Sequence, residues 1–213
     1  MNIALIGATG FVGSALLTEL LQRGHRVTAL ARDTHKLSAQ SGLTVIQADV
    51  QDAAQVAQAV QGHDAVISAF NAGWRNPNLY ADFIAGSKAI TAGMMAGGVK
   101  RLLVVGGAGS LYVAPGIQLV DTEGFPAEWK IGATAARDAL TQIQTQSDLE
   151  WTFISPPVHL APGERTGQFR TGGDELLMTS DGPASISTAD LAMAIVDEIE
   201  TPQHLRRRFT VGY

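Results

Sequence analysis

Short apolar runs alternate with longer segments of helical periodicity over the first 155 residues of the chain. A strand with one solvated face would alternate apolar and polar residues, whereas these runs are almost continuously apolar. Such runs are typical of parallel strands that are covered by helices on both faces. The sequence therefore predicts an α/β fold on a doubly wound parallel sheet, with strands at 3–6, 27–31, 45–46, 65–69, 102–105 and 151–154.

Helix signals occupy the segments between these strands. Asp52, followed three residues later by Gln55, forms a capping-box pattern. Asn76-Pro77 opens a longer helix, because a proline in the first turn loses no intrahelical hydrogen bond. The expected helices cover about 11–23, 52–60, 76–97 and 132–146. With helices between the strands, we expect right-handed crossovers and the strand order 3-2-1-4-5-6.

The regular alternation stops after Pro156-Pro157. We find no internal repeat, linker or low-complexity tract beyond it, so a single domain is expected. Its core would be 1–155, and residues 156–213 would form a small C-terminal cap on the substrate side together with the final strand. This part contains short segments near 166–171 and 175–179, a helix from Ser187 with Asp190 as its capping-box partner, and a strand at 209–211.

The composition narrows the classes of function. Hydrophobic residues make up 46% of the chain and charged residues 16%, which argues against disorder. A net charge of −5 gives no electrostatic basis for nucleic-acid binding, and we interpret the one basic cluster, Arg206–Arg208, as a solvated edge. The chain has no cysteine, and its histidines show no metal-ligand spacing.

One uncharged stretch, 102–120, is long enough to span a bilayer. Glycines and a proline interrupt it, so we interpret it as a buried strand and a loop. A cleaved secretory signal is not expected, because cleavage would remove a glycine motif that starts at Gly7. These features predict a cytoplasmic protein that binds no membrane, no nucleic acid and no metal.

Three glycines follow the first strand directly and open the first helix, in the pattern Gly7-x-x-Gly10-x-x-Gly13. In Rossmann folds the first glycine makes a tight turn, the second lets the backbone approach a pyrophosphate, and the third lets the helix pack against the sheet. The helix N-terminus then binds the phosphates. We expect a dinucleotide here, held by Gly7, Thr9, Gly10, Phe11, Val12 and Gly13; the alternative is a merely tight turn.

The next strand ends suggest how the rest of the dinucleotide is held. Arg32 suits a 2′-phosphate, because a guanidinium can bind it through two hydrogen bonds, and this favours NADP. Asp33 keeps NAD possible, because an acidic residue at this place accepts from a ribose hydroxyl. A solvated Arg32 is the other alternative. Asp49 and Val50 would lie at the adenine; the alternative for Asp49 is an aspartate that forms a turn. The remaining expected contacts are Ala69, Phe70, Gly106 and Pro156.

Candidate chemistry gathers at the same carboxyl edge of the sheet, where ligands of such folds bind. Ser110 is a candidate to polarise a substrate carbonyl, and His159 is a candidate acid. The alternatives are that Ser110 caps a turn and that His159 is structural. Trp74 and Trp129, in polar loops rich in glycine and proline, could stack on a flat substrate or anchor those loops. Asn71 and Tyr112 complete the expected substrate site.

Taken together, several stretches resemble the atypical short-chain dehydrogenase/reductases. The nearest likeness is to a bacterial group described as NADH-flavin reductases or NAD(P)H-binding proteins, which is related to NmrA-like proteins and to biliverdin reductase B. The resemblance covers essentially the whole chain. It rests on Gly7–Gly13, Ala31–Asp33, Asp64–Phe70, Val104–Ser110, Ser155–Pro157, Gly163–Gly167 and Arg208–Tyr213.

The chain departs from the wider family at one point. Short-chain dehydrogenases use Tyr-x-x-x-Lys, in which the lysine lowers the pKa of the tyrosine. The tyrosines here are Tyr80, Tyr112 and Tyr213, and none has this lysine. Hydride transfer to an electrophilic planar acceptor needs no such pair. The resemblance thus implies an NAD(P)H-dependent reductase of a flavin or quinone, acting as a monomer or homodimer. A non-catalytic NmrA-like redox sensor and an epimerase- or dehydratase-like protein of sugar nucleotides are the alternatives.

Overall fold

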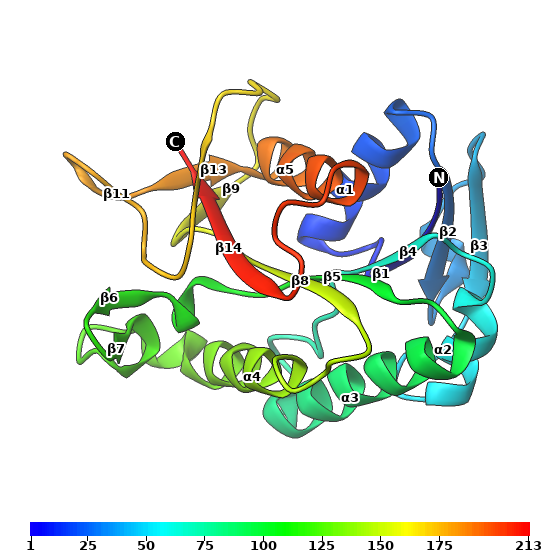
Figure 1. Ribbon diagram of the computed structural model, residues 1–213, viewed down its shortest axis with the longest axis horizontal. Helices are drawn as coiled ribbons and strands as arrows, with labels where there is room; N and C mark the ends of the chain where they lie inside the picture. Colours follow the sequence, from blue (N-terminus) through cyan, green and yellow to red (C-terminus); the bar gives the residue numbers. More distant parts are fainter.

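An eight-stranded sheet crosses the molecule in the computed structural model, which describes residues 1–213 (Figure 1). Its spatial order is β3-β2-β1-β4-β5-β8-β14-β10, and only the β14–β10 pair is antiparallel. The predicted order 3-2-1-4-5-6 is confirmed, with β8 as the sixth strand. The strands are β1 (Asn2–Ile6), β2 (Arg26–Ala31), β3 (Leu43–Gln47), β4 (Ala65–Ser68), β5 (Arg101–Val105), β8 (Glu150–Ser155), β10 (Arg170–Gly172) and β14 (Arg207–Gly212).

Helices cover both faces of this sheet. Figure 1 shows α1 and α5 on one side and α2, α3 and α4 on the other. Within β1, Ile3 and Leu5 pack toward the first layer, while Ala4 and Ile6 pack toward the second. The strands β1, β2, β4, β5 and β8 each contribute residues to both apolar cores, which explains their continuous hydrophobic runs. The helices are α1 (Phe11–Gln22), α2 (Ala53–Val60), α3 (Leu79–Gly97), α4 (Ala127–Ile143) and α5 (Thr188–Glu200).

The C-terminal strand and helix differ from the expected cap. β14 pairs in parallel with β8, and its Phe209 and Val211 are 2% and 0% exposed. α5 packs against α1, at the opposite end of the chain. The strand predicted at 209–211 is present, but it belongs to the main sheet, where it pairs with β8 and buries Phe209 and Val211 in the α1–α5 core.

Short strands form the surface around the carboxyl edge. Two hairpins flank one end of the molecule, β6–β7 and β11–β12 (Figure 1). β9 pairs in parallel with β13 as a separate ribbon. These strands are β6 (Tyr112–Ala114), β7 (Ile117–Gln118), β9 (His159–Ala161), β11 (Met178–Thr179), β12 (Gly182–Pro183) and β13 (Ser185–Ser187). Short 3₁₀ turns cover Thr34–Lys36, Ala108–Ser110 and Leu119–Asp121.

Both expected capping boxes form in part. The Asp52 carboxylate accepts from the N–H groups of Ala54 and Gln55, as predicted, but the Gln55 side chain bonds the Asp52 carboxylate and the Asp49 N–H. Ser187 likewise caps α5 by accepting from Asp190 N–H.

The Asp190 carboxylate is used elsewhere. It accepts from Thr166, Gly167 and Tyr213, and the N–H of Ser187 donates to the Tyr213 hydroxyl instead. A tertiary contact replaces the reciprocal bond in the α5 box, whereas in the α2 box local contacts to Asp52 and Asp49 replace it. Two further boundaries shift: α3 begins two residues after Pro77, and α4 begins directly after Pro126 and ends at Ile143.

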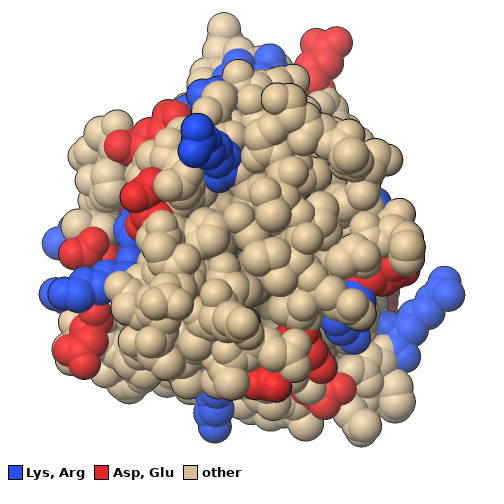
Figure 2. Space-filling view, turned by 90° about the vertical axis from the view of Figure 1, so that its right-hand side faces the viewer, with Lys and Arg blue, Asp and Glu red and all other residues tan.

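On the face that Figure 2 shows, Lys, Arg, Asp and Glu side chains are scattered around the periphery, and neither sign gathers in a patch. Among the five helices, none combines the length and apolar composition needed to cross a bilayer. The cytoplasmic location stays a prediction.

Candidate functional site

The glycine motif forms a closed turn between β1 and α1. Gly7 has a φ of +82°, and its carbonyl accepts from the Gly10 N–H at 2.9 Å. A Cβ on Gly7 would lie 2.4 Å from the Ala69 carbonyl oxygen, and one on Gly13 would lie 1.9 Å from the Gly7 carbonyl oxygen. The turn, the end of β4 and the first turn of α1 are therefore in contact, as the close packing of the motif requires.

No side chain caps α1. Its N-cap residue is Gly10, and Thr9, Gly10 and Phe11 are exposed, with Phe11 at 55%. The first N–H groups of a helix lack intrahelical partners and carry a partial positive charge. An anionic group such as a pyrophosphate can bind them without displacing a side chain. Val12 is half-buried against the α1–α5 core.

Arg32 and Asp33, at the end of β2, have different surroundings. The Asp33 carboxylate caps the 34–36 turn by accepting from the His35 N–H at 3.1 Å. Arg32 is exposed and makes no ion pair; its carbonyl alone accepts, from Gln47. The guanidinium is therefore the group with free hydrogen-bonding capacity at this strand end.

Asp49 and Val50 follow β3. Asp49 forms a turn in which its carboxylate accepts from the Gln51 N–H at 3.0 Å. The turn-forming alternative for Asp49 therefore describes the structure. Val50 is 8% exposed and packs into the α2–α3 core, so its side chain is structural. Adenine contact by these two residues stays a prediction.

The ends of β4, β5 and β8 meet at the same edge. Ala69 reaches the Gly7 turn, but the Phe70 ring turns away and packs on Phe83 and on Gly86 of α3. Asn71 caps its own loop by accepting from the Gly73 N–H at 2.7 Å.

Only glycine fits at position 106, after β5, because a Cβ there would lie 2.0 Å from the Phe153 ring. The N–H of Gly106 donates to Ile154 of β8. Pro156 is buried at the end of β8. The three strand ends thus form a close-packed floor in which backbone, more than side chains, faces the carboxyl edge.

Ser110 is buried at the end of the 108–110 turn that follows β5. Its side chain is 2% exposed, and its hydroxyl accepts from Arg208 Nη1 at 3.3 Å. This contact favours a structural role, and the catalytic role of Ser110 stays a prediction. His159 is exposed on β9, where it pairs with Ser185.

Arg208 is a residue that the sequence analysis misassigned. It is 7% exposed, its guanidinium binds Asp174 and Ser110, and the solvated edge that we expected is wrong for this member of the cluster. It lies on β14 between the exposed Arg207 and Phe209, whose side chain belongs to the core on the other face. Strand alternation could have placed it in the sheet, but the sequence could not identify Asp174 as its partner.

The expected substrate aromatics do not gather in one place. Trp74 and Trp129 meet edge to face, with ring centroids 4.8 Å apart, and Trp74 packs on Gly132 of α4. Trp129 lies in the first turn of α4 rather than in a loop. Half of each indole remains exposed. Tyr112 belongs to β6 and lies beside a different cavity.

That cavity has a volume of about 800 Å³ and lies between the β6–β7 hairpin and the segment 174–183. Tyr112 is 37% exposed there. The backbone N–H of Tyr112 donates to Asp174, and its carbonyl accepts from Leu176, so these contacts join the two walls. Sequence reasoning missed the other lining residues, which are Val113, Ala114, Pro115, Gly116, Asp174, Glu175, Leu176, Met178 and Pro183.

No tyrosine is paired with a lysine. The Tyr80 hydroxyl donates to Asp138 at 2.7 Å, and this bond raises the pKa of Tyr80, opposite to the shift that a proton-relaying tyrosine needs. The Tyr213 hydroxyl donates to Asp190. The geometry therefore supplies a dinucleotide cradle without the usual dehydrogenase acid.

Solved structures of similar proteins share this fold over the full chain. A Burkholderia pseudomallei protein, for which export has been suggested, is 46% identical, with a TM-score of 0.89 and full coverage of both chains. A Bacteroides thetaiotaomicron protein, suggested to be an epimerase, is 42% identical, with a TM-score of 0.93 over 100% of this chain and 96% of that one. A Streptococcus pneumoniae protein, suggested to be an NADH-flavin reductase, is 36% identical, with a TM-score of 0.87 over 100% and 99%.

The family model described as NAD(P)H-binding matches residues 7–202, which include the glycine turn, Arg32 and the end of β8. This range starts at the first glycine of the motif. The expected resemblance to atypical short-chain dehydrogenase/reductases is confirmed by the match and by the fold. The chain belongs to the NAD(P)H-binding family.

Proposed function

We propose that this protein is an NAD(P)H-dependent reductase that delivers hydride to a neutral planar acceptor such as a flavin or a quinone. The observation that carries the proposal is the cavity beside Tyr112. Its volume of about 800 Å³ lies within the range of small-molecule sites. β6 starts only a few residues after β5 ends, so the cavity follows a strand end of the carboxyl edge, where the glycine turn also lies.

The walls of this cavity suit an uncharged ring system. Tyr112, Met178 and Pro183 offer apolar and aromatic surface for a flat molecule. Asp174 and Glu175 bring negative charge to the cavity. Asp174 forms an ion pair with Arg208, whereas Glu175 has no ion-pair partner. Glu175 would repel a phosphate, so riboflavin or a quinone fits better than FMN.

The bound dinucleotide would supply the hydride. The residues of this chain bind and orient: the turn at 7–13 holds the pyrophosphate, Arg32 holds a 2′-phosphate, and Tyr112 holds the acceptor ring. No side chain need pass a proton, because a reduced flavin or quinone can take it from water. The absence of a tyrosine–lysine pair is consistent with this chemistry. A site without that pair is unsuited to alcohol oxidation.

A screen of NADPH oxidation tests the proposal. Riboflavin, FMN and a short-chain quinone are compared, alongside NADPH affinity measured by titration. We expect turnover with riboflavin or the quinone and a higher KM for FMN. NADPH binding without turnover on any acceptor would contradict the reductase and favour the NmrA-like sensor.

A matched pair of variants tests the location of the acceptor. Tyr112→Ala should raise the acceptor KM about two- to tenfold, the value of an aromatic stacking contact, with NADPH affinity unchanged. Trp74→Ala, which removes a more exposed aromatic side chain outside the cavity, should leave the acceptor KM and the NADPH affinity unchanged. The reverse pattern would move the acceptor to the Trp74–Trp129 pair.

A further inference from the structure

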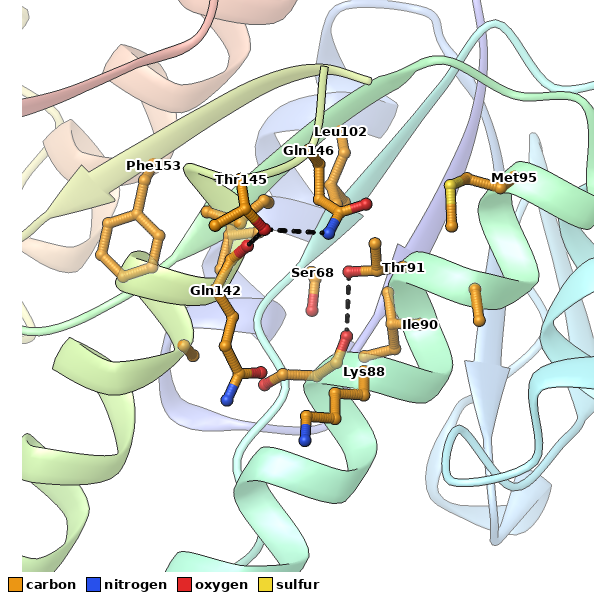
Figure 3. A pocket seen from close by; sticks show the side chains of 15 residues that line it. Ser68, Lys88, Ile90, Thr91, Met95, Leu102, Gln142, Thr145, Gln146 and Phe153 are labelled. Carbon is orange, nitrogen blue, oxygen red and sulfur yellow. Dashed lines mark hydrogen bonds between the residues drawn. The ribbon is translucent and has the colours of Figure 1, made fainter. Parts of the chain in front are cut away.

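A second cavity, with a volume of about 340 Å³, lies between α3 and α4 (Figure 3). Ile90, Leu102 and Phe153 form its apolar floor against the sheet. None of residues 7–13 lines it, and neither does any residue of the cavity beside Tyr112. Its volume is within the range of small-molecule sites, and it is independent of the proposed reductase site.

Ser68 makes this cavity more than a packing gap. It is the last residue of β4, lies on the same side of the strand as Val66, and is 4% exposed. Figure 3 shows its hydroxyl directed into the cavity, and no protein group hydrogen-bonds to it.

Neighbouring hydroxyls in the same wall differ from Ser68. Ser87 donates to the Phe83 carbonyl at 2.8 Å, and Thr91 donates to the Ser87 carbonyl at 3.0 Å. The Ser68 hydroxyl opens on the cavity and has no protein partner, so its hydrogen bond is left for water or for a ligand that fills the space. Ser68 therefore indicates a polar ligand atom deep in the cavity.

The charge at the mouth indicates the other end of the ligand. Lys88 is exposed, makes no ion pair, and is the only charged residue that lines the cavity. The amide of Gln142 points into the same space without a protein partner (Figure 3). A single cation beside free hydrogen-bond donors favours an anionic group.

We propose that this cavity binds a small amphipathic carboxylic acid. Its carboxylate lies at Lys88 and Gln142, its apolar or aryl body lies on the floor, and a hydroxyl at its far end exchanges a hydrogen bond with Ser68. The site is thus polar at both ends and apolar between them, which selects against purely apolar molecules and against strongly acidic ones without a hydrocarbon body.

The probe is 3-(4-hydroxyphenyl)propionate, titrated into the full chain by calorimetry and by amide chemical-shift mapping. We expect saturable binding with shifts at Ser68 and along α3 and α4. The neutral amide should bind about two- to fivefold more weakly, and the difference should vanish in Lys88→Met. The analogue that lacks only the phenolic hydroxyl, 3-phenylpropionate, should bind about two- to tenfold more weakly than the probe. That difference should vanish in Ser68→Ala.

Two variants serve as controls. Lys100→Met removes an exposed lysine outside the cavity, and Ser87→Ala removes a lining hydroxyl that already has a partner. Both should keep both ligand preferences, and thermal melts establish that all variants fold. Absence of saturable binding, displacement of the probe by NADPH with shifts at 7–13, or equal losses in the control variants would overturn the proposal.

Discussion

At the scale of single residues, Arg32 and Asp33 at the end of β2 differ in their hydrogen bonding. Asp33 is engaged as the cap of the next turn, while the Arg32 guanidinium is free. Arg32→Ala should therefore weaken NADPH binding by about 1.5–3 kcal/mol, the range for a charge-assisted hydrogen bond, and leave NADH binding nearly unchanged. Titration of both cofactors against both proteins measures this, with Arg26→Ala as a control for charge alone. Equal losses for the two cofactors would contradict the role of Arg32.

Gly13 offers a second test at this scale, because its space is occupied by backbone. A Cβ at Gly13 would lie 1.9 Å from the Gly7 carbonyl, so Gly13→Ala must displace the turn from α1. We expect a loss of about 1–3 kcal/mol in unfolding free energy and a larger loss of dinucleotide affinity. Gly107→Ala is the matched control, since no atom lies within 4 Å of its Cβ position. Retained NADPH affinity in Gly13→Ala would mean that the turn is not the phosphate site.

At the scale of elements, a buried carboxylate joins α1 to the segment before β10. Glu19 is 4% exposed and accepts from Arg165 at 2.8 and 2.9 Å and from Arg23 at 2.7 Å. The hydrogen bonds from Arg165, and after them the one from Arg23, lower the pKa of Glu19 below its ordinary value of 4.5, against the opposing effect of burial. Glu19→Gln should cost about 1–3 kcal/mol of unfolding free energy at pH 7.

The pH dependence follows from the direction of that shift. A carboxyl whose pKa is lower in the folded state adds stability above its unfolded-state pKa and loses it as the pH falls through the folded-state pKa. The difference between the wild type and Glu19→Gln should thus be full at pH 7 and shrink below about pH 4.5. Urea unfolding at several pH values measures it. A difference that stays constant down to pH 3 would show that packing, not charge, is responsible.

At the scale of the whole molecule, the two ends of the chain share one sheet and one core. α1 packs on α5, and β14 lies inside the sheet beside β8. We expect calorimetry to show one unfolding transition. Phe209→Ala should lower the free energy of unfolding by about 3–5 kcal/mol and shift that single transition to a lower temperature. Met178→Ala, in the exposed β11–β12 hairpin, should change it by less than about 0.5 kcal/mol. Two transitions, of which Phe209→Ala shifts only one, would restore a separate C-terminal cap.

Local chemistry made much of this molecule predictable. Gly7 and Gly13 predict the turn, because only glycine fits the backbone geometry and contacts at these positions. Continuous apolar runs predict buried parallel strands. The strand order through β8 follows from the alternation of strands with helices. These signals depend on neighbours in sequence, so a sequence alone carries them.

Other features depend on partners far away in the chain, and only the tertiary structure decided them. Arg208 is buried because Asp174 and Ser110 reach it, and Asp190 leaves its capping box because Tyr213 and Thr166 offer better-placed donors. In the sequence Ser68 is one more residue of a strand, and only the packing of α3 and α4 shows that a cavity lies in front of it. The sequence by itself determined the periodicities, turns and cofactor motif, because these arise within a few residues. The burial and pairing of single polar side chains were decided by packing, because they arise only where distant segments meet.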